Sequence, residues 1–255
     1  MLNLKKQSET IQLGEIDLGT CPICHSYVSH IYFMQDKESK KQSRWYSCSC
    51  GVVWNTHKPT MIYDKKYIER FDPHNNKLAP TYEYPVHIYS PLIEELLYNR
   101  RCLLIGKQTA HQEDALLKRG WVAESIDKNE ASKPTFCGDF ETYEFKEGTK
   151  FGMIWAYHTL ECFTDPIASF QKMRDLLTED GILYLASPDT DFIHTRGSSC
   201  FRHWKPEMNY LMWNRRAITR QLENLGFNII MARQNCWMRF PETDDFHIVA
   251  QKKFF

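Results

Sequence analysis

The sequence has no excess of charge of either sign. Its 255 residues contain 32 lysines and arginines against 32 aspartates and glutamates, a formal net charge of +0. Proteins that bind nucleic acids usually carry a basic excess, because lysine and arginine neutralise the phosphate backbone. The balance therefore argues against a nucleic acid as the main partner, although a local basic patch is compatible with it.

Long apolar runs are also missing. The first residues, MLNLKKQSETIQLGEIDLG, lack the continuous apolar stretch of a secretory signal peptide. No later segment is apolar over the length that a membrane-spanning helix needs. We therefore expect a soluble, cytoplasmic protein without a membrane partner.

The cysteines lack the even number and regular pairing of a secreted disulfide scaffold. There are nine, an odd number, and most of those in the main body of the chain are scattered singly. This distribution fits a reducing compartment with one thiol site. That site is a cluster near the N-terminus, formed by Cys21, Cys24, Cys48 and Cys50.

The cysteine cluster has the ligands of a zinc site. Two residues separate the first pair, as in a common zinc knuckle, whereas one residue separates Cys48 from Cys50. Four thiolates occupy the corners of the tetrahedron that Zn²⁺ prefers and leave no position open for substrate. We predict a structural Zn²⁺ in a ribbon module over residues 1–57. The alternatives are buried thiols without a metal, or a ligand supplied by His25 or His30.

The remainder of the chain predicts one larger domain. Residues 58–90 are rich in tyrosine, proline and asparagine without a regular apolar period, which indicates an aromatic linker. Over residues 91–255, apolar runs typical of buried strands alternate with amphipathic segments typical of helices. This alternation predicts an α/β fold with a doubly wound, mostly parallel sheet.

Local signals predict where some elements begin and end. Ser90 followed by Pro91 is typical of the start of a helix. The amphipathic pattern over 165–181 predicts a helix that Gly181 ends. The last two apolar runs, FNIIMARQN and DFHIVAQKKF, are joined by a segment too short for a crossover helix, so we expect them to pair antiparallel.

The stretch CLLIGKQTAHQEDALLKRGWVAESID, residues 102–127, reads as strand, turn, helix and a second strand that ends in an acid. A nucleotide-type cofactor site often begins in this way in α/β proteins. The turn is not a phosphate-binding P-loop, because Lys107 is followed by Gln108 rather than by serine or threonine.

The chain resembles the class I methyltransferases that depend on S-adenosyl-L-methionine (SAM), in particular a bacterial and phage subgroup with an N-terminal zinc ribbon. The resemblance rests on the Y-D-x-x-Y motif at 63–67, on FGMIWAYHTLECFTDPIASFQKMRDLLTEDGILYLASPD, and on HWKPEMNYLMWNRRAITRQLENLGF. It implies a Rossmann-like sheet of seven strands beside a small zinc ribbon. It also implies methyl transfer from SAM to a small-molecule or glycan-type acceptor.

The resemblance assigns cofactor-binding roles to several residues. Gly106 would let the amino-acid end of SAM pass close to the backbone. Lys107 would pair with the carboxylate of SAM. Asp127 would accept hydrogen bonds from the ribose hydroxyls, and Asp139 would bind the adenine amino group.

Further residues fall where the family places the mouth of the pocket. Ala156 and Tyr157 lie where the fourth strand opens onto the cofactor. His158 is our candidate for a base that removes a proton from the acceptor, the alternative being a histidine of the pocket wall or core. His203 and Trp204 would either form a lid over the substrate or anchor a loop.

Several positions depart from the family pattern. Leu104 stands where an acid usually orients the methionine ammonium, Gln108 and Ala110 replace glycines, and Gly152 replaces an aspartate. These changes favour an alternative function, in which a pseudo-methyltransferase serves as a non-catalytic binding or assembly module. In that case the ribbon would dock a protein partner.

Overall fold

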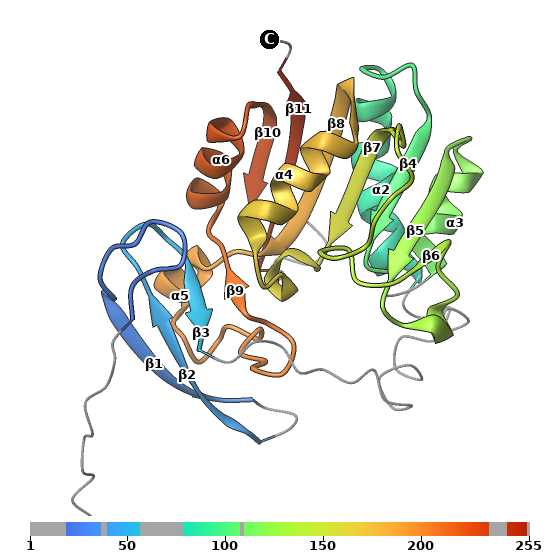
Figure 1. Cartoon of the computed structure of the whole chain (residues 1–255). Coiled ribbons are helices and arrows are strands. Elements are labelled where there is room, and N and C mark those ends of the chain that lie inside the picture. Colours follow the sequence, from blue (N-terminus) through green and yellow to red (C-terminus); the bar gives the residue numbers. More distant parts are fainter. Residues whose placement is uncertain (1–18, 37–39, 57–78, 108–109, 235–243, 254–255) are drawn as a thin grey trace, which may run out of the picture.

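The computed structural model describes residues 19–36, 40–56, 79–107, 110–234 and 244–253 (Figure 1). These residues form a four-stranded sheet and a seven-stranded sheet, and helices cover the larger one. The motif at 63–67, most of the predicted linker and Gln108 lie outside the described residues. None of the described helices is long and apolar enough to cross a membrane.

The small sheet is antiparallel, in the order β1-β2-β3-β9. Three of its strands come from the N-terminal region and the fourth from far along the chain, so the main body of the protein contributes to the ribbon. The strands are β1 (His30–Gln35), β2 (Gln42–Ser47), β3 (Val53–Asn55) and β9 (Leu211–Met212).

The large sheet has the order β10-β11-β8-β7-β4-β5-β6. Its strands are parallel from β8 to β6, whereas β11 is antiparallel to both of its neighbours. This confirms the doubly wound, mostly parallel sheet of seven strands and its antiparallel end. The strands are β4 (Arg101–Ile105), β5 (Val122–Asp127), β6 (Phe136–Cys137), β7 (Phe151–Tyr157), β8 (Leu177–Pro188), β10 (Phe227–Gln234) and β11 (Asp245–Lys252).

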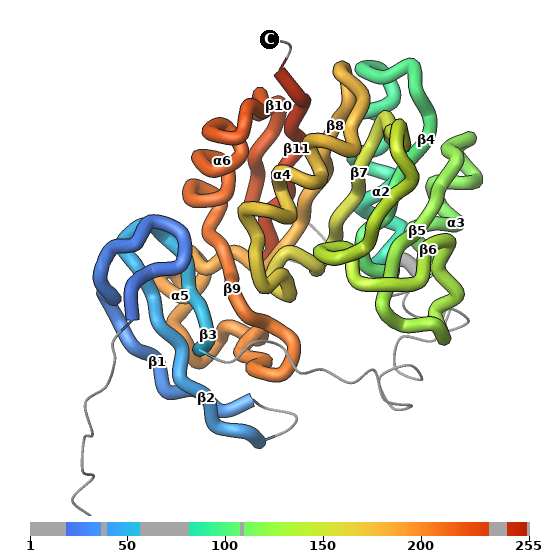
Figure 2. The backbone as a smooth tube through the Cα atoms, viewed as in Figure 1, coloured from blue at the N-terminus to red at the C-terminus, as the bar shows by residue number. Residues whose placement is uncertain are grey.

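Helices lie on both faces of the large sheet (Figure 2). One face packs against α2 (Ala79–Glu94) and α3 (Ala110–Lys118), and the other against α4 (Pro166–Leu176) and α6 (Arg215–Asn224). The short helix α5 (Asp191–Arg196) packs against the small sheet. Two 3₁₀ helices, η1 (Glu130–Ser132) and η2 (Leu160–Cys162), follow β5 and β7.

The two helical layers explain the continuous apolar sequence of β7. Met153 and Trp155 pack into the cluster with α2 and α3, whereas Ile154 and Ala156 pack into the cluster with α4 and α6. Successive side chains of a strand point to opposite faces of a sheet. A strand that is covered on both faces therefore carries apolar residues at every position.

The helix expected to begin at Pro91 starts much earlier, so this prediction is wrong. Helix α2 runs Ala79–Glu94 and contains Pro85 as well as Pro91. Proline removes one backbone hydrogen bond from a helix interior, which normally ends the helix. Here Val86 and Ile93 are fully buried against the large sheet, and this packing stabilises the helix in spite of its prolines.

The helix expected over 165–181 is also shorter than predicted. It ends at Leu176, and Leu177 is the first residue of β8. Threonine, aspartate and glycine are weak helix formers. The Thr178 hydroxyl donates a hydrogen bond to the Asp180 carboxylate (2.8 Å) at the start of β8, where the pairing with β7 shifts its register.

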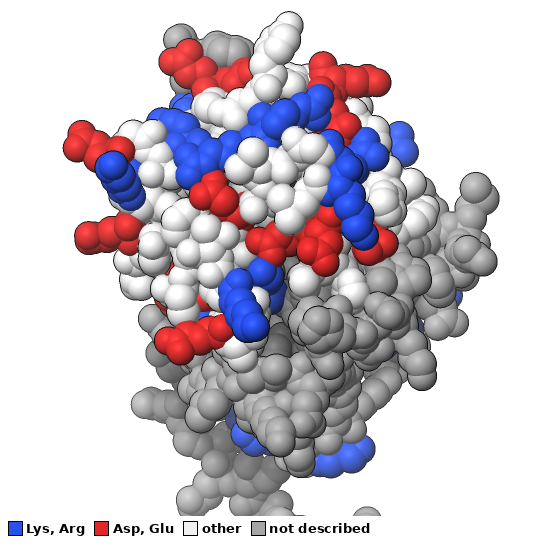
Figure 3. All heavy atoms as spheres, turned by 90° about the vertical axis from the view of Figure 1, so that its right-hand side faces the viewer, with Lys and Arg blue, Asp and Glu red and all other residues white. Residues whose placement is uncertain are grey.

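The surface on the side of β5 and β6 carries charges of both signs (Figure 3). Over the described residues of this face, lysine and arginine side chains alternate with aspartate and glutamate side chains. This mixture agrees with the formal net charge of +0.

Candidate functional site

The carboxyl ends of β4, β5 and β6 bring three predicted cofactor-binding residues together. The Gly106 N–H, just after β4, donates to the carbonyl of Ile126 (2.9 Å). The Gly138 N–H donates to the carbonyl of Asp127, also at 2.9 Å, and Asp139 follows directly. Ligands bind at this edge in open α/β sheets, because the loops there converge.

Gly106 is required by the packing of the protein itself. Its φ of +82° is a left-handed conformation, and a Cβ at this position would lie 2.7 Å from the hydroxyl oxygen of Thr159. That hydroxyl is held in place, since it donates to the carbonyl of Ile105 (2.8 Å). The glycine therefore lets the turn after β4 approach the turn after β7.

Asp127 is a buried carboxylate with spare hydrogen-bonding capacity. It is 8% exposed and accepts a hydrogen bond from the Asn129 N–H (2.8 Å). Burial raises its pKa, and the backbone N–H groups of Asn129 and Lys107 partly offset this effect. A carboxylate can accept about four hydrogen bonds. The donors present therefore leave room for hydroxyl groups of a ligand.

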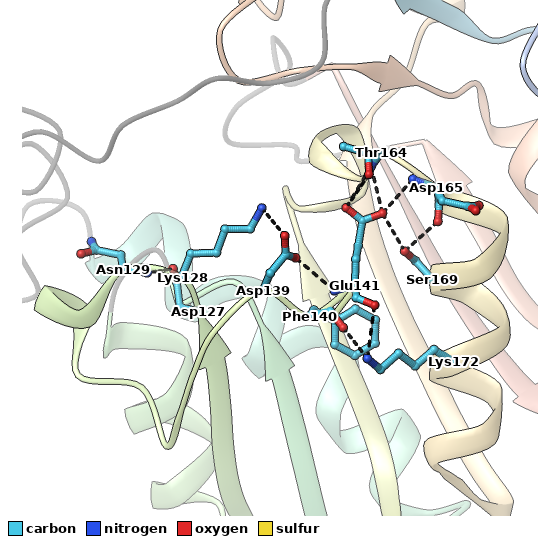
Figure 4. A network of polar contacts seen from close by, with 10 residues as sticks. All are labelled: Asp127, Lys128, Asn129, Asp139, Phe140, Glu141, Thr164, Asp165, Ser169 and Lys172. Carbon is cyan, nitrogen blue, oxygen red and sulfur yellow. Dashed lines mark hydrogen bonds and ion pairs between the residues drawn. The ribbon is translucent and has the colours of Figure 1, made fainter. Parts of the chain in front are cut away.

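Asp139 is engaged by two groups of the protein (Figure 4). Its Oδ2 lies 2.7 Å from the ammonium of Lys128, and its Oδ1 accepts a hydrogen bond from the Glu141 N–H at 3.0 Å. An adenine amino group would therefore have to share this carboxylate with Lys128.

Glu141 is a structural residue of the site that the sequence analysis missed. Its carboxylate accepts hydrogen bonds from the N–H groups of Thr164 (2.9 Å) and Asp165 (2.7 Å), as Figure 4 shows. These contacts join the segment after β6 to the start of α4, where a negative charge is favoured by the helix dipole. No sequence motif marks this role, because the partners are more than twenty residues apart.

Leu104 and Lys107, which the resemblance places near the methionine end of SAM, contact other parts of the protein. Leu104 is buried in the apolar cluster with α2 and α3. The ammonium of Lys107 pairs with the Glu113 carboxylate and donates to the carbonyl of Lys133 (3.1 Å). Free access of Lys107 to a cofactor carboxylate would require these two contacts to break.

Close packing accounts for the glycine that replaces an aspartate in β7. A Cβ on Gly152 would lie 2.0 Å from the backbone carbonyl oxygen of Asn99. No side chain fits there, because the backbone of Asn99, two residues before β4, occupies the space that an aspartate would need.

Ala156 and Tyr157 end β7 and are both buried. Ala156 pairs with Ile105 of β4, which places the end of β7 beside the Gly106 turn. The Tyr157 ring packs edge-on against Tyr82 of α2 (6.1 Å between ring centroids), and burial raises the pKa of its phenol.

His158 is clamped between two carboxylates. Its Nδ1 lies 3.5 Å from Glu161 Oε1, and its Nε2 lies 3.1 Å from Asp245 Oδ2. Burial alone lowers the pKa of His158, but the two carboxylates outweigh burial and raise it well above its ordinary value. A protonated imidazole cannot take a further proton, so these contacts disfavour the expected role as a base.

The backbone of His158 is also unusual. Its φ is +51°, a left-handed conformation that residues with a Cβ seldom adopt. The imidazole stacks on that of His203, with 5.7 Å between the centroids. Strained backbone is often retained at functional sites, where the surrounding contacts hold it in place.

His203 and Trp204 have separate roles. His203 Nε2 lies 3.1 Å from Asp244 Oδ1, next to the His158 cluster. Trp204 is buried against Trp45 of the ribbon, and its indole N–H donates to the carbonyl of Ser198 (2.7 Å). Trp204 therefore anchors its loop on the ribbon, which was one of the two expected roles.

The cysteine cluster has the geometry and chemistry of a metal site. The four sulfur atoms all lie within 4.8 Å of one another. The Cys24–Cys48 and Cys21–Cys50 sulfur separations are 3.3 and 3.7 Å. A tetrahedral zinc site with Zn–S bonds of about 2.3 Å has sulfur atoms about 3.8 Å apart. The four thiols therefore fit the predicted Zn²⁺.

A family model described as a methyltransferase domain matches residues 77–232. Curated protein sequences give no match. Among solved structures, the fold is similar to that of the plantazolicin methyltransferase BpumL in complex with SAH. The TM-score is 0.55 at 13% identity, over 74% of this chain and 90% of that one.

Two further structures are similar. A chain in the complex of the Haloferax volcanii Trm112 methyltransferase activator has a TM-score of 0.55 at 12% identity, over 76% of this chain and all 100% of that one. A SAM-dependent methyltransferase from Clostridium acetobutylicum has a TM-score of 0.53 at 11% identity, over 74% and 98% of the two chains. At these identities the likeness establishes the fold alone.

Proposed function

Because the chain belongs to the methyltransferase domain family, we propose that it transfers the methyl group of SAM to a small-molecule or glycan-type acceptor. The sulfonium of SAM supplies an activated methyl group. The protein then has to hold donor and acceptor in line and exclude competing reactions.

One observation carries this proposal. Asp127 ends β5 and Asp139 follows the adjacent parallel strand β6, beside the Gly106 turn, and the Asp127 carboxylate is still able to accept hydrogen bonds. We assign the ribose hydroxyls to Asp127 and the adenine amino group to Asp139. Gly106, Lys107, Ala156 and Tyr157 complete the proposed cofactor-binding set.

The methionine end of the proposed site is weaker. A hydrogen bond to a charged group contributes about 1.5–3 kcal/mol, and the buried Leu104 cannot form one with the methionine ammonium. We therefore expect SAM to bind roughly tenfold to a hundredfold less tightly than it would to a site with an acid there.

His158 is proposed as a positioning residue rather than as a base. Its two ring nitrogens hold the carboxylates of Glu161 and Asp245 at the end of β7. Loss of this imidazolium would leave two buried carboxylates without their shared partner, and the edge of the sheet would rearrange.

We also propose that Cys21, Cys24, Cys48 and Cys50 hold a structural Zn²⁺. The donor set of four thiolates leaves no position open for chemistry. The metal would stabilise the ribbon, whose small apolar cluster is completed by Ile193, Phe201 and Trp204 from the main body of the chain.

A second candidate function is a non-catalytic binding module. The burial of Leu104 and the internal pairing of Lys107 favour it. The ribbon also exposes two large side chains, Tyr27 at 86% and Phe33 at 72%, which could contact a protein partner.

Calorimetric titration with SAM and SAH tests the proposal. We expect micromolar binding to the full chain, and Asp127→Ala should weaken it at least about tenfold, because the ribose loses its acceptor. The matched control is Glu124→Ala, which removes a carboxylate from the same strand at its Arg101 pair. An unchanged affinity in Asp127→Ala, or no binding at millimolar SAM, would favour the binding module.

A further inference from the structure

A second cluster of metal-type ligands lies away from the cysteines. His203, Asp244 and Asp245 each offer one donor atom, and these atoms all lie within 4.8 Å of one another. Asp245 is the first residue of β11 and pairs with Pro188, the last residue of the oppositely directed β8. The cluster is therefore at the carboxyl edge of the parallel strands, beside His158 at the end of β7.

Among the described residues, each aspartate has one buried oxygen without a hydrogen-bond partner. Asp244 is 2% exposed and Asp245 is 6% exposed. Asp244 Oδ2 and Asp245 Oδ1 form no hydrogen bond within the described part of the chain. Burying a charged oxygen in this state is costly, and protein interiors nearly always supply a partner for it.

Within the described residues, the neighbouring side chains contact the other oxygen of each aspartate. His203 Nε2 (3.1 Å) and Arg202 Nη2 (3.8 Å) approach Asp244 Oδ1. His158 Nε2 approaches Asp245 Oδ2 at 3.1 Å, and its Nδ1 is occupied by Glu161. Each carboxylate is thus oriented through one oxygen, and its second oxygen has no hydrogen-bond partner among the described residues.

We propose that His203, Asp244 and Asp245 bind a divalent transition-metal ion. Two carboxylate oxygens and one imidazole nitrogen form a mixed hard and intermediate donor set that suits Mn²⁺, Fe²⁺ or Zn²⁺. Three protein ligands leave coordination positions open for water or for an oxygen atom of a bound molecule.

His158 has a defined place in this site. It contacts the Asp245 oxygen that is not assigned to the metal, which fixes the orientation of the carboxylate. Groups that orient metal ligands in this way commonly alter metal affinity about tenfold to a hundredfold when they are lost. The proposal concerns the binding of the ion itself and does not depend on methyl transfer.

Mn²⁺ is the probe that separates this site from the cysteine cluster, because thiolates select softer ions. The full chain is loaded with one equivalent of Zn²⁺, which the four thiolates take up, and is then titrated with Mn²⁺ without SAM, with free Mn²⁺ measured by electron paramagnetic resonance. We expect saturable binding with one ion per chain and a ¹⁴N coupling from the imidazole. His203→Gln should abolish the coupling, and Asp244→Asn or Asp245→Asn should weaken binding at least about tenfold.

Two controls make the result specific. Glu124→Gln removes a carboxylate outside the cluster and should bind Mn²⁺ as the unmodified chain does, as should Cys137→Ser, at an exposed cysteine outside both clusters. Circular dichroism and thermal unfolding of each variant establish that it is folded. The proposal is overturned if the unmodified chain shows no saturable Mn²⁺ binding, or if both aspartate variants bind Mn²⁺ with unchanged affinity.

Discussion

The backbone carbonyl of Gly51, in the second cysteine knuckle, accepts a hydrogen bond from the N–H of Asn214, the residue that caps α6 (3.1 Å). The same carbonyl accepts a second hydrogen bond from the Thr190 hydroxyl (2.8 Å). The knuckle is therefore joined directly to the start of a helix that packs on the large sheet. Changes in the ribbon should affect the main domain through this junction.

Gly51→Ala should destabilise the protein strongly. The φ of +101° is unfavourable for alanine, and the added Cβ would lie 2.3 Å from the Asn214 side chain. We expect a loss of about 3 kcal/mol or more, measured by denaturant unfolding. Gly148→Ala is the matched control, because its φ is +78° with no neighbour within 4 Å, so it should lose only about 1–2 kcal/mol. Equal losses in the two variants would contradict this account of the junction.

Removal of the proposed zinc should loosen the same junction. A strong chelator, or Cys24→Ser, should lower the thermal midpoint and speed hydrogen exchange at the Asn214 amide, because its acceptor belongs to the knuckle. Metal analysis should show zinc in the untreated protein. Cys137→Ser, at another exposed cysteine, should leave both readouts unchanged. A midpoint that is insensitive to the chelator would argue for buried thiols without a metal.

Gly106→Ala should reveal the contact between the turns after β4 and β7. We expect a loss of about 2 kcal/mol or more from the positive φ and the overlap with the Thr159 hydroxyl. Thr159→Ala in the same chain removes the overlap, so a double-mutant cycle should give a favourable coupling of at least about 1 kcal/mol. Purely additive effects would show that Thr159 does not limit this position.

Leu104→Glu should not restore a methionine-binding acid. The side chain belongs to the cluster between the sheet and α2, so a carboxylate there would be buried without a partner. We expect a loss of about 3 kcal/mol or more, against less than about 1.5 kcal/mol for the volume-conserving Leu104→Met. Titration with SAM completes the test, and tighter binding by Leu104→Glu would refute this interpretation.

Glu94 should make stability depend on pH in the acid range. Its carboxylate accepts two hydrogen bonds from Arg119 (2.8 Å each) and one from the Trp121 indole (3.0 Å). Chiefly the Arg119 hydrogen bonds lower its pKa from 4.5 to about 2. Because the folded pKa is the lower one, the stabilisation is present above pH 4.5 and is lost as the pH falls toward 2.

Glu94→Gln should therefore be less stable at neutral pH by about 1–3 kcal/mol. The difference from the unmodified protein should shrink as the pH falls through that window, as measured by denaturant unfolding. Glu95→Gln, at the exposed neighbouring position, is the control and should change stability little. A difference that is constant between neutral and acid pH would exclude the ion pair as its cause.

Local patterns in the sequence predict the alternation of strands and helices in the larger domain. The alternation of apolar runs with amphipathic segments, and the short connection before β11, follow from the periods of strands and helices and from chain geometry. The residue type and spacing of the four clustered cysteines likewise indicate a metal site. These features depend on residues that are neighbours in the chain.

Tertiary packing decided the rest. Packing against the large sheet stabilises α2 although the helix contains Pro85 and Pro91. Packing also adds β9 to a ribbon whose other strands lie far away in the sequence. It also brings His158, our candidate for a base, between the carboxylates of Glu161 and Asp245, which favour its protonated form. Protonation, strain and unpartnered oxygens depend on atoms that only the folded chain places within a few ångströms, which is why the sequence could nominate His158 but could not determine its charge.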